Sequence, residues 1–138
     1  LMKSVARAQG LIVNKTIDQR KDFVKSATAA ASLLSTVCIP EAKRILNELD
    51  VEYNQNELWF KLLVLHIYHA GAGNVQSLLN QQETPLSGKE LIVWMWKNEY
   101  GNFKNASQNY TQVAIAALLS LQDEIYAHCD FIFDCEPF

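Results

Sequence analysis

The hydrophobic positions of this chain recur with the period of a helix, and no stretch keeps the strict alternation of a half-buried strand. Residues 58–69 are apolar almost all round, which predicts a central buried helix. Residues 110–121 carry apolar side chains on one face, which predicts an amphipathic helix with Asn105 or Ser107 as its N-terminal cap. The pattern as a whole predicts an all-α fold. We expect further helices over residues 1–9, 22–37, 41–49, 71 or 73 to 79, and 87–97.

Single residues mark several of the expected helix boundaries. Gly10 should end the first helix, because glycine accepts the left-handed conformation that closes many helices. Asp22 is placed to cap the next helix with its carboxylate. Pro40 lacks the N–H that a helix interior needs, so we expect it to break the chain and to open a short amphipathic helix.

Charge is unevenly distributed along the 138 residues. A hydrophobic content of 49% and a charged content of 20% indicate a globular domain with a core. The net charge is −3, but all 12 Lys and Arg precede residue 121, so residues 1–120 carry +2 and the remainder −5. Even residues 1–120, which carry the weak positive charge, lack a dense Lys and Arg face, so we expect no nucleic-acid partner. We divide the chain into a domain over residues 1–121 and an acidic tail over residues 122–138.

The longest apolar run, Leu58–Tyr68, is interrupted by Lys61 and His66 and is too short to cross a bilayer. We therefore expect no transmembrane segment in this chain. No Cys-x-x-Cys or His-x-x-x-His spacing occurs, so we expect no metal site, and nothing in the sequence calls for a cofactor.

The three cysteines leave at least one thiol unpaired. Cys38 lies in an apolar run and is expected to be a buried small hydrophobe. Cys129 and Cys135 could close a small disulfide loop in an exported protein or remain free thiols, and both alternatives stay open.

The run Ile67–Val75 (IYHAGAGNV) combines a helix stop with a helix start. Gly71 can end one helix, and the next helix begins at once. Such a corner brings side chains, backbone N–H groups and a helix N-terminus to one place, which suits a ligand cleft. The run resembles the Ala-Tyr-Asn-Ala-Gly-Pro-Gly-Asn-Val corner of the lytic murein transglycosylases, a family of the lysozyme-like superfamily.

Other segments resemble the same family and occur in its order. Leu1–Arg7 (LMKSVAR) is similar to the family's Leu-Met-Pro-Ala-Thr-Ala-Arg segment, and Asn109–Val113 (NYTQV) to its Arg-Asn-Tyr-Val-Pro helix. The likeness covers most of residues 1–121 and is closest to the membrane-bound type D branch. The family's Gly-Leu-x-Val-Asn, Asp-x-Arg-x-Asp-Pro and Lys-Ser-Thr-x-Ala-Ala elements resemble, in order, Gly10–Asn14 (GLIVN), Asp18–Asp22 (DQRKD) and Lys25–Ala30 (KSATAA).

The resemblance implies a lysozyme-like fold and an extracytoplasmic protein, in the periplasm or cell envelope, whose partner is the glycan strand of peptidoglycan. Family enzymes cleave the bond between N-acetylmuramic acid and N-acetylglucosamine with one glutamic acid, and they release a 1,6-anhydro product. That glutamate precedes the Leu-Met-Pro segment, and this chain begins with Leu1, so we expect an N-terminally incomplete domain without a catalytic residue. Two interpretations stay open: part of a longer transglycosylase, or a non-catalytic glycan-binding or structural helical module.

The resemblance also implies which residues bind substrate. Tyr68 matches a tyrosine that lines the family's cleft, and a core tyrosine with a bonded hydroxyl is the alternative. His69 replaces the family's Asn. It either contacts the ligand or is a neutral substitution without a role in binding. Tyr110 either walls the cleft or packs in the core. The expected substrate-binding residues are Tyr68, His69, Ala70, Gly71, Asn74 and Tyr110.

Two other groups of residues are weaker candidates. Glu52, Glu57 and Glu99 lie in polar sequence surroundings, so we expect solvated surface acids rather than catalytic ones. Trp94 and Trp96 either stack on sugar rings or divide between core and surface.

Overall fold

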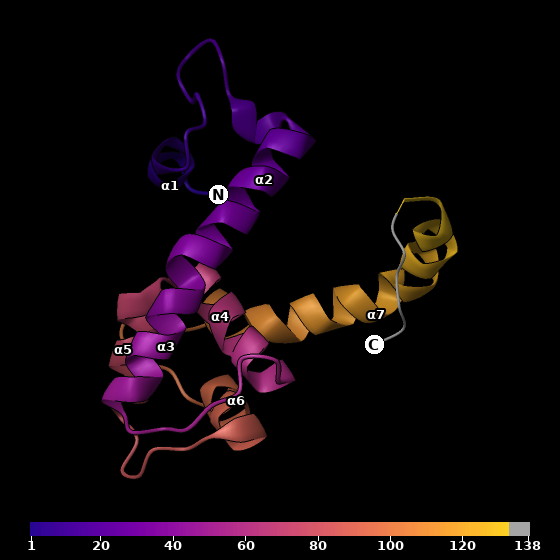
Figure 1. Cartoon of the computed structure of the whole chain (residues 1–138). Helices are drawn as coiled ribbons and strands as arrows, with labels where there is room; N and C mark the ends of the chain where they lie inside the picture. The colour runs from indigo at the N-terminus through magenta and orange to yellow at the C-terminus, as the bar shows by residue number, and fades with distance from the viewer. Residues whose placement is uncertain (133–138) are drawn as a thin grey trace.

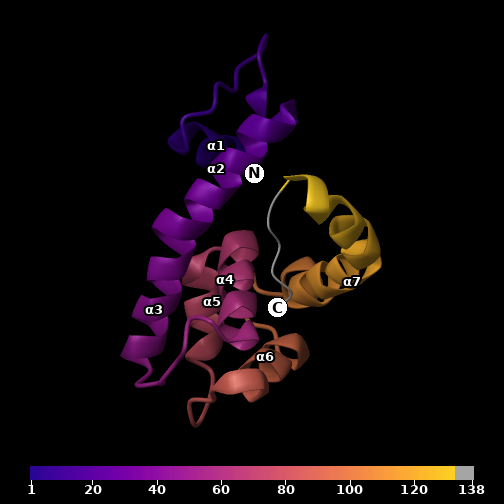
Figure 2. The same ribbon diagram turned by 45° about the vertical axis from the view of Figure 1, so that its right-hand side comes forward.

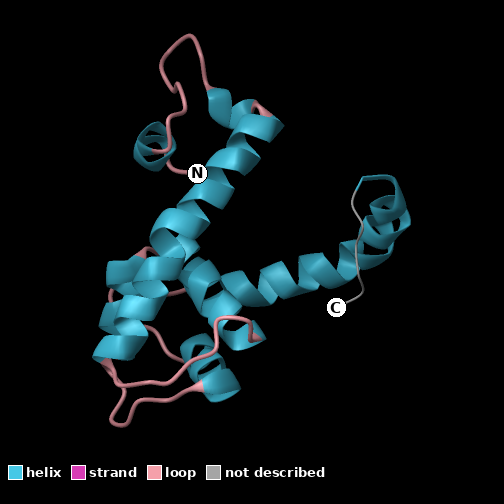
Figure 3. Cartoon of the chain, in the orientation of Figure 1, coloured by secondary structure: helices cyan, strands magenta, loops and turns pink. Residues whose placement is uncertain are grey.

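The computed structural model describes residues 1–132, except for the side chains from residue 123 onward. Over this range the regular secondary structure is helical, with two isolated β-bridges, Val13–Asp18 and Tyr100–Phe103, and no strand (Figure 3). The predicted all-α class is therefore confirmed. Helices bond their own backbone N–H and C=O groups, so the apolar side chains can be buried without a sheet.

The core is built around α4 (Leu58–Ala70), the helix that the sequence predicts to be buried. It packs against α3 (Ile39–Glu48), α5 (Ala72–Leu79) and α6 (Gly88–Lys97), as Figures 1 and 2 show. Each large apolar side chain buried here contributes about 1.5–3 kcal/mol. The fully buried apolar residues of this cluster include Ala42, Ile45, Leu46, Leu63, Val75, Leu78, Leu79, Leu91, Met95 and Phe103.

One helical run extends from Phe23 to Glu48 and passes through Pro40 without ending. It consists of α2 (Phe23–Leu33), a π-helical turn η2 (Leu34–Cys38) and α3. The predicted break at Pro40 is therefore wrong.

The π turn explains how the helix tolerates its proline. In a regular α-helix the ring of Pro40 would crowd the carbonyl of Thr36, four residues earlier. Directly before Pro40 the helix widens, and the N–H of Ile39 bonds to the carbonyl of Leu34, five residues back. The hydroxyls of Ser35 and Thr36 donate to the carbonyl of Ser32 at 3.1 and 2.7 Å, which satisfies an acceptor where the helix widens.

The first 33 residues form an arm that leads away from the core (Figure 1). The arm holds α1 (Lys3–Ala8), a loop, the 3-10 turn η1 (Gln19–Lys21) and α2. Gly10 follows α1 with φ +82°, and the Asp22 carboxylate accepts from the N–H of Lys25 at 3.0 Å, so both predicted boundaries are confirmed. A second, smaller apolar cluster of Ala6, Leu11, Val13 and Ala29 packs α1 and the loop on α2.

The last described helix, α7 (Ala106–Ile132), projects from the core on another side (Figures 1 and 2). Thr111 and Ile115 pack its first turns against the core, whereas residues 116–122 are exposed. The helix continues through residue 121, and the division of the chain into a domain and an acidic tail stays a prediction. Any bond between Cys129 and Cys135 lies outside the described side chains.

The run Phe23–Glu48, 26 residues long, is apolar enough to cross a membrane by length and composition alone. Core helices and N-terminal signal sequences meet the same test. Ala42, Ile45 and Leu46 of this run are fully buried in the core. The expectation that the chain has no transmembrane segment stays a prediction.

Candidate functional site

Gly71 ends α4 and begins α5 in a single step. Its φ of 85° and ψ of 147° belong to a region open to glycine and to few other residues. Its N–H donates to the carbonyl of Ile67 at 2.8 Å, and its own carbonyl accepts from Val75 at 3.2 Å. A Cβ at Gly71 would meet open space, so the requirement for glycine is conformational. The predicted helix stop is confirmed, although the ψ of 147° at Gly71 differs from that of the left-handed helical conformation we expected.

Asn74 fastens this corner from within α5. Its Nδ2 donates to the carbonyl of Ala70 at 2.7 Å, which satisfies one of the acceptors left free at the end of α4. The amide N–H of Asn74 is thus used inside the corner, and Asn74 is not among the residues that line the cleft beside it.

A cleft of about 510 Å³ lies between the corner and the N-terminal arm. Tyr68, His69, Ala70 and Gly71 line it together, so the expectation that the corner lies at a concave surface is confirmed. The opposite wall is apolar and comes from the two residues before α1, from α1 itself, from α2 and from the π turn. Its residues are Leu1, Met2, Val5, Leu33, Val37 and Cys38.

Tyr110 reaches the same corner from α7. Its ring stacks on that of His69, with centroids 4.2 Å apart and an interplanar angle of 15°. Partial burial raises the pKa of the Tyr68 hydroxyl, and the neighbouring Tyr110 and Cys38 raise it further. Tyr68 therefore remains a neutral hydrogen-bonding phenol. The structure thus gathers Tyr68, His69, Ala70, Gly71 and Tyr110 at one place.

The described lining of the cleft contains no carboxylate. Glu52 and Glu57 line a different hollow, with Tyr53, Trp59 and the start of α6, and Glu99 is not among the cleft residues. Within the described residues no three His, Cys, Asp or Glu side chains are grouped to hold a metal ion. The described residues of the cleft therefore offer hydrogen-bonding and apolar surface.

A buried hydrogen-bond chain fixes α7 beside this site. His66 Nδ1 lies 3.1 Å from the carbonyl of Ser107, and His66 Nε2 lies 2.9 Å from Thr111 Oγ1. A carbonyl only accepts, so Nδ1 carries the proton and Nε2 accepts from the threonine hydroxyl. Trp96 Nε1 donates to the same hydroxyl at 2.8 Å. Burial lowers the pKa of His66 to about 4, and the neighbouring His69 contributes to the shift.

The tryptophans of α6 serve the core rather than the cleft. Trp94 and Trp96 both pack against the main cluster, and the indole N–H of Trp96 is used by Thr111. Cys38 is buried, as expected, and burial raises the pKa of its thiol.

The wall formed by Leu33, Val37 and Cys38 was not anticipated as part of the site. In sequence these residues belong to an ordinary apolar stretch, and only their position opposite Tyr68 gives them this role. Comparison of the chain with models of protein families, with curated proteins and with solved structures finds no match.

Proposed function

We propose that this chain is a lysozyme-like helical domain that binds the glycan strand of peptidoglycan in the cleft beside Gly71, in the periplasm or cell envelope. One observation carries the proposal. The corner residues that resemble the transglycosylase motif, Tyr68 to Gly71, line one cleft, and Tyr110 stacks on His69.

The chemistry of the cleft supports an amino-sugar ligand. Its apolar and aromatic walls suit the C–H faces of sugar rings and the methyl groups of acetamides. The phenol of Tyr68 and the imidazole of His69 offer hydrogen bonds to hydroxyl and amide groups. Because the described lining holds no carboxylic acid, the function proposed for these residues is binding rather than cleavage.

The first test separates binding from cleavage. Purified peptidoglycan incubated with this chain should release no 1,6-anhydro muropeptides, because none of the described residues that line the cleft is an acid. Appearance of an anhydro product would contradict the proposal and direct attention to Glu52, Glu57 and Glu99.

The second test measures glycan binding by calorimetry, with chitooligosaccharides and with isolated glycan strands. Tyr68→Phe should weaken binding by about 0.5–1.5 kcal/mol, the usual net contribution of one neutral hydrogen bond, and should leave thermal stability nearly unchanged. Tyr53→Phe is the matched control, because Tyr53 stacks on Phe60 beside a different hollow. No binding to either ligand, or equal losses in both variants, would refute the proposal.

His69 gives a second readout at the same site. It lines the cleft and its imidazole can donate or accept a hydrogen bond, so His69→Ala should weaken glycan binding. His69→Asn restores the residue of the resembling family and should keep more of the affinity than His69→Ala. Equal binding by wild type and His69→Ala would mean that His69 does not contact the glycan.

A further inference from the structure

The N-terminal arm carries a charge opposite to that of the rest of the chain. Residues 1–25 contain six of the 12 Lys and Arg and two of the 15 Asp and Glu, a net charge of +4, while the remaining residues carry −7. Asp18 pairs with Arg20 at 2.6 Å and Asp22 with Lys25 at 3.8 Å. Lys15 and Lys21 are exposed and form no ion pair within the described residues.

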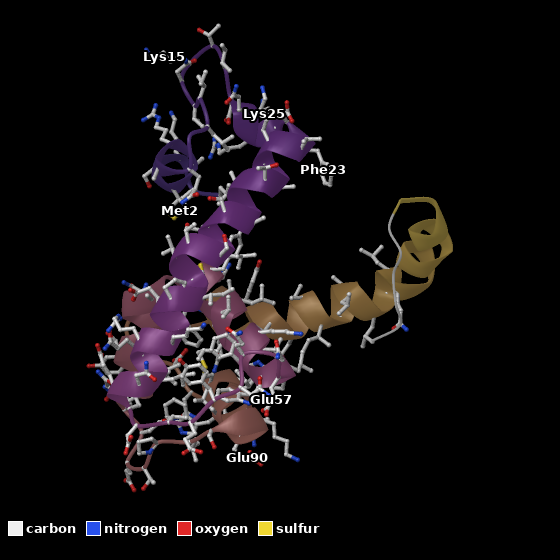
Figure 4. The ribbon with its side chains drawn as sticks, viewed as in Figure 1. Met2, Lys15, Phe23, Lys25, Glu57 and Glu90 are labelled. Carbon is white, nitrogen blue, oxygen red and sulfur yellow. The ribbon has the colours of Figure 1, made fainter. Side chains whose placement is uncertain are left out.

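The same end of the arm exposes large apolar side chains. Phe23 is 85% exposed and Val24 70% exposed, although both stand in the first turn of α2. Ile12 and Ile17, on the loop before α2, are also exposed. Figure 4 shows Lys15, Phe23 and Lys25 at the outer end of the arm, away from the core. We call residues 12–25 the basic tip.

Hydrogen bonds hold the basic tip in one shape. Val13 pairs with Asp18, the N–H of Asn14 donates to the carbonyl of Ile17 at 2.8 Å, and Asn14 Oδ1 accepts from Thr16 and Ile17 at 2.9 and 2.7 Å. The carboxylate of Asp22, the residue before Phe23, caps the N-terminus of α2. The exposed lysines and apolar side chains are therefore presented by a preorganised turn rather than by a loose end.

We propose that the basic tip docks on an anionic lipid bilayer. Basic side chains lie at the level of lipid headgroups, and neighbouring apolar side chains enter the boundary between headgroups and acyl chains. Charge complementarity favours this partner, because the tip holds four basic residues against two acids and presents Lys15 and Lys25 at its outer end, where a negative surface can meet them. Phe23, Val24 and Ile17 favour a bilayer over nucleic acid, since phosphate tracking has no use for exposed apolar side chains. The inference does not rest on the proposed glycan site, because none of these residues lines the cleft.

Sedimentation with lipid vesicles tests the proposal on the whole chain. The protein should bind vesicles containing roughly one third phosphatidylglycerol, bind pure phosphatidylcholine weakly, and lose affinity as salt screens the lysines. Lys15→Gln and Lys21→Gln should each lower the partition coefficient about fivefold. Phe23→Ser should lower it about tenfold.

Matched substitutions elsewhere separate the tip from general charge and hydrophobicity. Lys89→Gln and Lys97→Gln on α6 remove the same charge and should leave vesicle binding unchanged. Val113→Ser on α7 matches Val24→Ser in chemistry and exposure, and only Val24→Ser should weaken binding. All seven substituted positions are exposed, so melting temperatures should stay within a few degrees of wild type.

Three outcomes would overturn the proposal: no binding to anionic vesicles at low salt, binding that tip and control variants lose equally, or equal binding to neutral vesicles. A fourth outcome would also overturn it and assign the tip to another partner. In that case the wild-type protein does not bind vesicles, and the tip variants lose binding to peptidoglycan or to nucleic acid.

Discussion

Replacing Thr111 by valine should destabilise the protein far more than the loss of one hydroxyl implies. Thr111 is fully buried, and its hydroxyl serves two neighbours at once, because it donates to His66 Nε2 and accepts from Trp96 Nε1. Valine keeps the shape of threonine and removes both hydrogen bonds. Water cannot replace the hydroxyl at a site with no exposed surface.

The magnitude follows from the two polar groups left behind. A buried donor or acceptor without a partner costs about 1–3 kcal/mol, so Thr111→Val, which leaves two such groups, should lower the free energy of unfolding by roughly 2–6 kcal/mol. That is a large share of the 5–15 kcal/mol typical of a domain. Adding Trp96→Phe removes one of the two orphaned groups. The double variant should therefore lose about 1 kcal/mol less than the sum of the single losses.

Urea unfolding followed by far-UV circular dichroism measures both quantities. Thr28→Val is the control, because Thr28 is exposed on α2 and bonds only to the carbonyl of Val24. Its cost should stay within about 0.5 kcal/mol. If Thr111→Val cost no more than Thr28→Val, the hydrogen-bond chain from α4 through α7 to α6 would not contribute to stability.

Two further predictions concern the same helices. Burial lowers the pKa of His66 from its ordinary 6.5 to about 4 in the folded protein. The neutral imidazole therefore contributes fully to the free energy of unfolding above about pH 6.5. Roughly 3 kcal/mol should be lost as the pH falls toward 4, and a urea midpoint independent of pH in wild type, or one that falls equally in His66→Asn, would contradict this assignment. Asn74→Ala should cost about 0.5–1.5 kcal/mol by freeing the Ala70 carbonyl. Thermal unfolding measures that loss, and an unchanged melting temperature would show that the corner does not depend on Asn74.

Local signals in the sequence predict much of the secondary structure, because each depends on one residue and its neighbours. Gly10 and Gly71 end helices through backbone conformations that a side chain would strain, and Asp22 caps α2 through its own carboxylate. The buried helix over residues 58–69 is equally visible, because a segment apolar all round has to be enclosed.

The features that escape prediction depend on more than one segment. Pro40 predicts a helix break from its own chemistry. The widened turn before it lets the helix continue, so the conformation of the neighbouring residues overrides that signal. The cleft wall of Leu33 and Val37 follows from how the end of α2 and the π turn lie beside the corner, and the hydrophobic periodicity of this segment does not predict that position. The corner itself carries a recognisable motif, so Tyr68 and His69 could be singled out, whereas the internal use of the Asn74 amide could not.

The π turn at Leu34–Cys38 also sets the rotational phase between the two ends of the long helix. Each helical residue rotates the chain by about 100° about the helix axis. Removing one residue here would therefore rotate the N-terminal arm by about that angle relative to the core. Leu33 would then turn away from Tyr68, while Ala42 and Ile45 would stay in the core. A change of one residue could thus open or close the cleft and leave the folding of the core untouched.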